Sequence, residues 1–261
     1  MKRISLIAIL AVLGMFILAY TPAEAATVGL WAFDEGSGVS AYDLSGYNNT
    51  GTLVNGPVWT TGKYGSALQF DGKNDYVGVT TGVGSSLNLS NAVTVEAWVK
   101  SQTAGAYDYV IAKYYDGGKA SYALDTDSSK ARFYVTTGGT YHQLTSNINI
   151  WDGAWHHIAG SYDMGASGNN LKLYIDGTLV NSGMTSGSMD MLASGNLYIG
   201  NYGAGTSWNF PGTVDEVRVS NVALNAEQLG YNGSLVPEPA TMSLLGLGLL
   251  GLLKLKRKKT V

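Results

Sequence analysis

Alternating side chains leave this chain few folds to choose from. From Val93 to Val99 every odd-numbered residue is apolar, which is the period of a β-strand with one face on a core. The same period recurs at Leu171, Leu173 and Ile175, and Asp176-Gly177 then separates two apolar runs, as in a tight β-hairpin. Further strands are predicted near residues 107–113, 122–125, 132–136, 156–162, 197–200 and 213–220. Many short strands joined by Gly-rich turns predict an antiparallel β-sandwich.

The composition agrees with an all-β chain. Among 261 residues there are 35 glycines and 17 tyrosines, and only 13% are charged, which is too aromatic for a disordered chain. The chain has no cysteine, so it can build neither a disulfide nor a thiolate metal site. One short C-terminal helix is expected at residues 225–228, where Asn225 and Gln228 match a capping box.

The N-terminal residues predict export. Lys2 and Arg3 precede an apolar stretch, and Ala23-Glu24-Ala25 has the small-x-small pattern of a signal peptidase site. We therefore interpret residues 1–25 as a signal peptide, with an uncleaved membrane anchor as the alternative, and expect the mature domain to span residues 26–235.

The C-terminal residues 236–261 have three parts. Two prolines in Val236-Pro237-Glu238-Pro239 block a continuous helix. An uncharged run then extends to Leu253, and a basic end follows with Lys254, Lys256, Arg257, Lys258 and Lys259. This order predicts a short membrane-anchor helix whose basic end stays cytoplasmic.

Together these parts resemble the PEP-CTERM sorting signal. The resemblance implies export, anchoring in the inner membrane through the C-terminal helix, processing near Pro-Glu-Pro by an exosortase-type enzyme, and a final place at the cell surface or in the extracellular matrix. A plain tail anchor is the alternative.

Charge limits the partners of the mature domain. Residues 26–235 keep 9 of the 16 basic and 17 of the 19 acidic residues, which gives a net charge of about −8, so we expect no nucleic-acid partner. Neutral ligands or cations suit such a domain better.

A second resemblance covers the whole mature domain. Its motifs are Gly29-Leu30-Trp31-Ala32-Phe33-Asp34-Glu35-Gly36-Ser37-Gly38, Ala67-Leu68-Gln69-Phe70-Asp71-Gly72, Thr94-Val95-Glu96-Ala97-Trp98-Val99, Trp155-His156-His157-Ile158-Ala159, Leu173-Tyr174-Ile175-Asp176-Gly177 and Thr213-Val214-Asp215-Glu216-Val217-Arg218-Val219. In order and spacing they are similar to a laminin-G-like jelly roll of the concanavalin A-like lectin/glucanase superfamily. The resemblance implies a two-sheet jelly-roll sandwich, a fold that hosts both binding modules and glycanases.

The acidic residues do not favour catalysis. A glycosidase needs paired carboxylates facing one cleft, whereas Glu96 is the only acid on its strand. Asp215 and Glu216 are adjacent, so regular alternation would point them to opposite faces. We therefore expect no enzyme activity.

Aromatic and amide side chains suggest a binding site instead. Tyr202, Trp208 and Asn209 lie in a Gly-rich loop where an exposed ring could stack on a sugar; the alternative is that this loop caps the core. The sequence predicts a non-catalytic module that binds polysaccharide or a surface protein. A hydrolase or lyase of the same fold and a ligand-free matrix protein are the alternatives.

Calcium is the one cofactor that we expect. By alternation Asp215 shares its face with Val217 and Val219, away from Arg218, so its buried carboxylate needs a partner. The turn at residues 70–76 offers oxygen donors. The resemblance places Asp71 and Asp215 as side-chain ligands, with Asn74 or Asp75 supplying a carbonyl; the alternative is that both aspartates only bond to the backbone.

Overall fold

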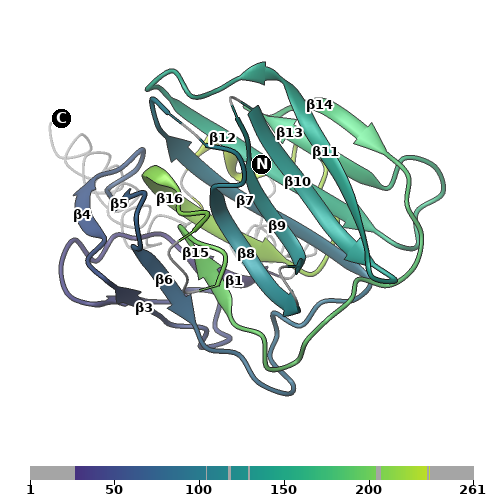
Figure 1. The fold of residues 1–261 in the computed structure, drawn as a ribbon, viewed down its shortest axis with the longest axis horizontal. Coiled ribbons are helices and arrows are strands. Elements are labelled where there is room, and N and C mark those ends of the chain that lie inside the picture. The colour runs from purple at the N-terminus through teal and green to yellow at the C-terminus, as the bar shows by residue number, and fades with distance from the viewer. Residues whose placement is uncertain are drawn as a thin grey trace, which may run out of the picture.

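Two antiparallel β-sheets lie face to face (Figure 1). The computed structural model describes residues 27–103, 105–116, 119–128, 130–203, 207–233 and 235. Within them each sheet has eight strands. The predicted all-β, two-sheet antiparallel sandwich is therefore confirmed, whereas the predicted segments 1–25 and 236–261 lie outside the described residues.

Sheet A has the strand order β14-β13-β12-β7-β16-β5-β4, with β1 also pairing with β16. Its strands are β1 (Thr27–Trp31), β4 (Val58–Thr61), β5 (Ser66–Asp71), β7 (Ala92–Lys100), β12 (Trp155–Asp163), β13 (Leu171–Ile175), β14 (Thr178–Gly183) and β16 (Pro211–Ser220).

Sheet B has the strand order β11-β10-β9-β8-β15-β6-β3-β2. Its strands are β2 (Ser40–Ala41), β3 (Gly51–Val54), β6 (Tyr76–Val79), β8 (Tyr109–Asp116), β9 (Lys119–Asp127), β10 (Lys130–Thr137), β11 (Thr140–Asn149) and β15 (Leu197–Ile199). In Figure 1 the strands β8 to β11 face the viewer.

The core lies between the sheets, as the alternation predicts. In β7 the side chains of Val93, Val95, Ala97 and Val99 are all buried in the main hydrophobic cluster. Close packing leaves no spare room: a Cβ added at Gly160 in β12 would meet the ring of Phe133 in β10 at 2.0 Å. Glycine therefore lets the two sheets approach at this point.

The predicted hairpin is present between β13 and β14. Asp176 has φ 49° and Gly177 has φ 73°, the two positive values that a type I′ turn requires. The side chain of Asp176 also accepts a hydrogen bond from the backbone N–H of His157 at 2.9 Å.

The prediction of a helix at residues 225–228 is wrong, because the structure has a turn there. The reciprocal capping bonds do form, from Glu227 N to Asn225 Oδ1 at 3.0 Å and from Asn225 N to Gln228 Oε1 at 3.1 Å. They close only a single turn, because Leu229 is extended with ψ 152°. A 3₁₀-helix, η1 (Gly230–Asn232), follows. Within the described part of the chain, no helix is long and apolar enough to cross a membrane.

A β-bulge in β16 overturns the alternation predicted around Asp215. Asp215 pairs with Trp98 and Arg218 pairs with Glu96, so three steps on β16 match two on β7. Glu216 is the extra residue of this bulge, and its φ is 49°. Val214, Val217 and Val219 lie in the core, and Asp215 and Arg218 therefore share the outer face of sheet A. The expectation that Asp215 shares a face with Val217 and Val219 is wrong.

The residues after β16, 221–233 and 235, cover the outer face of sheet A; we call them the C-terminal strap. Leu224 and Leu229 pack on Ala159 and Tyr174, and the Tyr231 ring stacks on Trp98 with centroids 5.7 Å apart. Glu96 and Trp98 are consequently buried on the face that alternation alone would expose to water.

Candidate functional site

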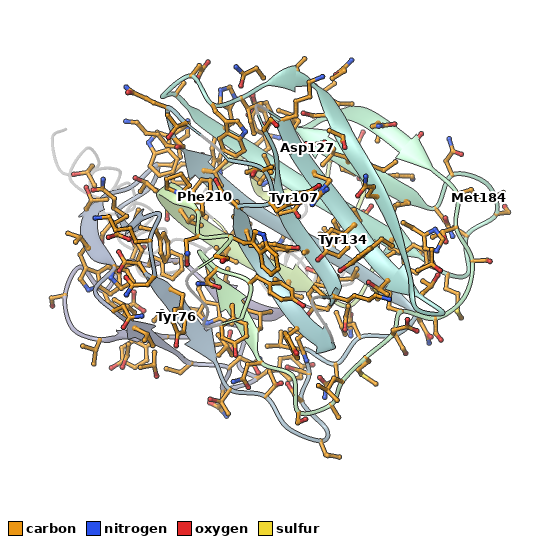
Figure 2. All side chains as sticks on the ribbon, in the orientation of Figure 1. Tyr76, Tyr107, Asp127, Tyr134, Met184 and Phe210 are labelled. Carbon is orange, nitrogen blue, oxygen red and sulfur yellow. The ribbon has the colours of Figure 1, made fainter. Side chains whose placement is uncertain are left out.

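An aromatic pocket lies on the outer face of sheet B. It has a volume of about 340 Å³ and is lined by Tyr107, Tyr109, Arg132, Tyr134, Tyr141, Gln143 and Trp208. Because Ala131, Phe133 and Val135 of β10 point into the core, the intervening Arg132 and Tyr134 point outward. Figure 2 shows Tyr107 and Tyr134 close together over the strands that face the viewer. We call this site the aromatic pocket.

Two aromatic rings stand at the rim in an unusual backbone conformation. Tyr107 has φ 71° and Trp208 has φ 64°, a region that bulky residues rarely adopt. The two residues are 46% and 43% exposed. The backbone is held by hydrogen bonds from Tyr107 N to Thr126 O at 2.8 Å and from Tyr109 N to Trp208 O at 3.1 Å. Strain of this kind is concentrated at functional sites.

The floor of the pocket combines a guanidinium group with tyrosine hydroxyls. Arg132 Nε donates to Asp125 Oδ1 at 2.7 Å, and its Nη2 donates to Asp125 Oδ2. The guanidinium carbon lies 4.7 Å from the Tyr107 ring centroid. The hydroxyls of Tyr109 and Tyr134 are 3.1 Å apart, and burial raises the pKa of both, so both stay protonated.

The three predicted ligand residues have different roles. Trp208 lines the pocket. Tyr202 is buried beneath it, with its ring centroid 5.4 Å from that of Trp208. Asn209 is also buried and holds the loop in place, donating from Nδ2 to Lys73 O at 2.6 Å. Only Trp208 is thus available to a ligand from the protein surface.

Sequence reasoning missed most of the pocket. Tyr107 and Tyr109, Arg132 and Tyr134, and Tyr141 and Gln143 are pairs two residues apart. Within a strand such spacing places both members on one face, as for Arg132 and Tyr134 in β10 and for Tyr141 and Gln143 in β11. Tyr107 instead precedes β8, in a turn. This signal was present, but the pairing of β8, β9, β10 and β11 was needed to bring the pairs together.

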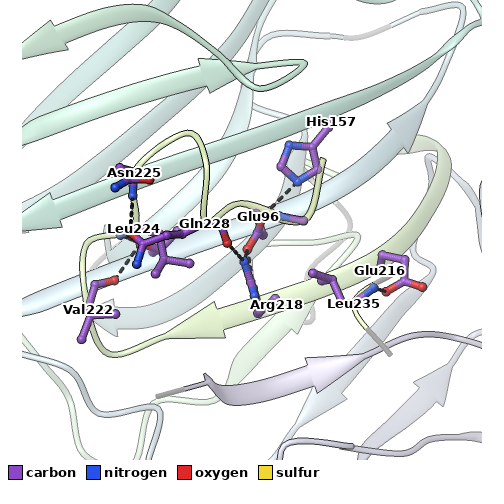
Figure 3. A network of polar contacts seen from close by, with 11 residues as sticks. Glu96, His157, Glu216, Arg218, Val222, Leu224, Asn225, Gln228 and Leu235 are labelled. Carbon is purple, nitrogen blue, oxygen red and sulfur yellow. Dashed lines mark hydrogen bonds and ion pairs between the residues drawn. The ribbon is translucent and has the colours of Figure 1, made fainter. Parts of the chain in front are cut away.

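The three acidic residues considered for catalysis, Glu96, Asp215 and Glu216, lie elsewhere, on the outer face of sheet A. Glu96 is fully buried and pairs with Arg218 and, at 3.0 Å, with His157 Nε2 (Figure 3). Glu216 is also buried and accepts a hydrogen bond from Leu235 N at 2.8 Å. The prediction that Asp215 and Glu216 point to opposite faces fails because of the bulge. Burial raises the pKa of Tyr64, and the charges of Glu216 and Asp215 raise it further.

The four predicted calcium ligands do not come together. Asp71 pairs with Pro211 at the start of β16, whereas Asp215 lies four residues further along that strand. Asp215 Oδ2 accepts hydrogen bonds from Lys63 N at 2.8 Å and Tyr64 N at 3.0 Å, and Oδ1 accepts one from Glu216 N. Burial raises the pKa of Asp215 to about 7.

The turn itself is also internally bonded. Asp75 Oδ2 accepts a hydrogen bond from Asp71 N at 3.1 Å. The carbonyl oxygen of Asn74 accepts a hydrogen bond from the side-chain amide of Asn55 at 2.9 Å. The carbonyl oxygen of Lys73 accepts one from the side-chain amide of Asn209. Among the described residues no group of three His, Cys, Asp or Glu side chains could hold a metal. The residues do not fit the predicted four-residue site, and calcium binding by Asp71, Asn74 and Asp75 stays a prediction.

Fold and site together define an antiparallel sandwich domain of the lectin and glucanase type. The family model of the Concanavalin A-like lectin/glucanases superfamily matches residues 71–230. The chain belongs to this superfamily, so the predicted laminin-G-like resemblance is confirmed. No curated protein matches the chain.

Several solved structures share the fold. Domain 4 of AbnA, a GH43 extracellular arabinanase from Geobacillus stearothermophilus, whose structure is in complex with arabinotriose, is 20% identical with a TM-score of 0.61, covering 77% of this chain and 95% of that one. The binding domain of Paraclostridial Mosquitocidal Protein 1 is 14% identical with a TM-score of 0.60, and that of botulinum neurotoxin serotype G is 13% identical with a TM-score of 0.59. These cover 78% and 77% of this chain, which spans about half of either toxin domain. At these identities the similarity establishes the fold.

The tail matches a second model, the PEP-CTERM protein-sorting motif, over residues 235–258. The predicted sorting signal is thereby confirmed. The motif indicates an exported protein that is sorted through a membrane-anchored C-terminal tail, and it implies processing by exosortase-type machinery.

Proposed function

We propose that this protein is an exported, non-catalytic carbohydrate-binding module that holds glycan in the aromatic pocket. It acts at the cell surface or in the exopolysaccharide matrix after its tail is processed. The proposal rests on the exposed rings of Tyr107 and Trp208. Both residues have a positive backbone φ, and both rings lie beside the hydrogen-bonding groups of the pocket floor. Pockets with aromatic walls and a few placed polar groups are typical ligand sites.

The occupied floor argues against a cationic ligand. An aromatic pocket can also hold an ammonium group through its ring faces. Here Arg132 takes that position, 4.7 Å from the Tyr107 centroid and 5.8 Å from the Tyr134 centroid. A polyhydroxylated ligand, stacking on the rim and bonding to the floor, fits the remaining space better.

The position of the carboxylates supports a binding role over catalysis. The seven lining residues of the described pocket include no acid, and Asp125 is bonded to Arg132 beneath it. Glu96, Asp215 and Glu216 are buried on the other sheet. A hydrolase would need two carboxylates beside the bound sugar.

Glycan-panel binding with rim variants tests the proposal. Trp208→Asn and Tyr107→Asn remove the rings while placing a residue that tolerates positive φ. Each should weaken binding by about tenfold or more, as loss of a central aromatic contact does. Tyr42→Asn is the matched control, because Tyr42 is an exposed tyrosine outside the pocket.

Two results would contradict this function. The first is a panel in which no glycan binds, or in which binding is unchanged in both rim variants. The second is sustained release of reducing sugar that is lost on replacing an acidic residue, which would identify a hydrolase or lyase instead.

A further inference from the structure

The charge of the pocket floor determines which glycans can enter. Arg132 is the one charged residue among the described lining residues. Its side chain is almost fully buried, and that of its partner Asp125 is completely so. Because Asp125 binds the guanidinium through both carboxylate oxygens, the pair as a whole is neutral.

The surroundings add little positive charge. Burial raises the pKa of Asp125, and Arg132 opposes this shift. Asp127 and Asp108, which lies between two lining tyrosines, are close enough to raise that pKa further. Lys130 stands opposite Asp127 in the register of β10 and β9. Lys119 lies 5.8 Å from the Tyr141 ring and donates to the carbonyl of Gly139.

Hydrogen-bonding capacity nevertheless remains. Arg132 has five N–H donors. Two are directed to Asp125, and a third, on Nη1, is directed to Gln143 at 3.3 Å. One N–H on each terminal nitrogen has no partner within the described part of the chain. Neighbouring sugar hydroxyls can accept these two bonds.

We propose that the aromatic pocket selects uncharged glycans and discriminates against sugars that carry a carboxylate or sulfate at this position; this rests on the proposed function. An anionic group near Arg132 would be attracted by its guanidinium, but the ionised Asp125 bonded to that guanidinium beneath the pocket would offset much of the attraction. The anionic group would also be desolvated without meeting a positive charge that is not already paired. A hydroxyl pair loses far less on leaving water.

A matched pair of ligands tests this selectivity. Neutral glucans and galactans are compared by calorimetry with the same polymers after oxidation of the C6 hydroxyl to a carboxylate. The wild-type chain should bind the neutral form at least tenfold more tightly, and that affinity should change little between low and high salt. Asp125→Asn leaves the guanidinium uncompensated, so it should increase affinity for the oxidised polymers by about tenfold relative to wild type.

The outcomes separate the two proposals. If the wild type binds the oxidised polymer as well as the neutral one, and Trp208→Asn abolishes both, the selectivity is wrong while the binding function stands. If no polymer of either kind binds, the binding function itself fails. The salt dependence of the wild type gives an independent answer should Asp125→Asn not fold.

Discussion

Replacing Glu96 by glutamine should destabilise the domain strongly. Its carboxylate is fully buried and pairs with Arg218 and His157 (Figure 3). It also accepts a hydrogen bond from Gly230 N at 2.8 Å. Glutamine keeps the shape but removes the negative charge, so the Arg218 side chain, only 14% exposed, loses its counter-charge.

The expected cost follows from the burial of this pair. Breaking a buried ion pair by removing one partner costs about 3–5 kcal/mol, and we expect the lower end because glutamine still accepts hydrogen bonds. For a domain of this size, about 3 kcal/mol lowers Tm by roughly 6–12 °C. Thermal unfolding followed by circular dichroism measures this shift. Glu227→Gln makes the same change at an exposed position of the C-terminal strap and should leave Tm within about 1–2 °C.

A pH series provides a second readout. Although burial alone would raise it, the His157 hydrogen bond, the Arg218 charge and the Gly230 N–H together lower the pKa of Glu96 below the ordinary 4.5. A lowered folded-state pKa stabilises the folded state above pH 4.5, and this contribution is lost as the pH falls through the folded-state pKa. The stability gap between wild type and Glu96→Gln should therefore narrow in acid. A Tm within 1–2 °C of wild type at neutral pH would refute the reasoning about the network.

Three further predictions concern the strap, the calcium site and a buried lysine. Deleting residues 236–261 should leave the thermal transition intact and release the protein from the membrane fraction. Deleting residues 224–261 also removes the Leu224 and Leu229 contacts and should lower Tm at least as much as Glu96→Gln. Equal Tm values for the two deletions would contradict this role of the strap. Asp215→Asn should lower Tm equally with calcium and with chelator, because the carboxylate accepts backbone N–H bonds. Any calcium dependence should instead be lost in Asp71→Asn, and its loss in Asp215→Asn would restore Asp215 as a ligand. Burial lowers the pKa of Lys113 to about 8, so above that pH the unfolded chain binds more protons than the folded one and the free energy of unfolding rises with pH. Between about pH 8 and 10 the wild type should gain about 2 kcal/mol of stability over Lys113→Met, measured by urea unfolding. Stability curves of the two proteins that run parallel over this pH range would contradict the lowered pKa.

Much of the fold could be predicted from local patterns. The alternation in β7 and the Asp176-Gly177 turn depend on the chain's own backbone geometry, so each appears in the sequence as it does in the structure. The sorting motif is likewise a short linear signal, and a family model matches it over residues 235–258, which overlap the predicted segment 236–261.

The outer faces of the two sheets could not be predicted in this way. The bulge at Glu216 arises where β16 pairs with β7, a strand more than 100 residues earlier, and it changes which way Asp215 points. Nothing near Glu96 in the sequence indicates that Gly230 and Tyr231 will cover that face. The aromatic pocket has the same origin, because strand pairing and the loop carrying Trp208 bring its residues together. The sequence by itself determined the strand period, the hairpin, the superfamily and the sorting tail, since these depend on neighbours along the chain; only tertiary packing decided which carboxylates are buried and where a ligand can stack, since these depend on contacts between distant segments.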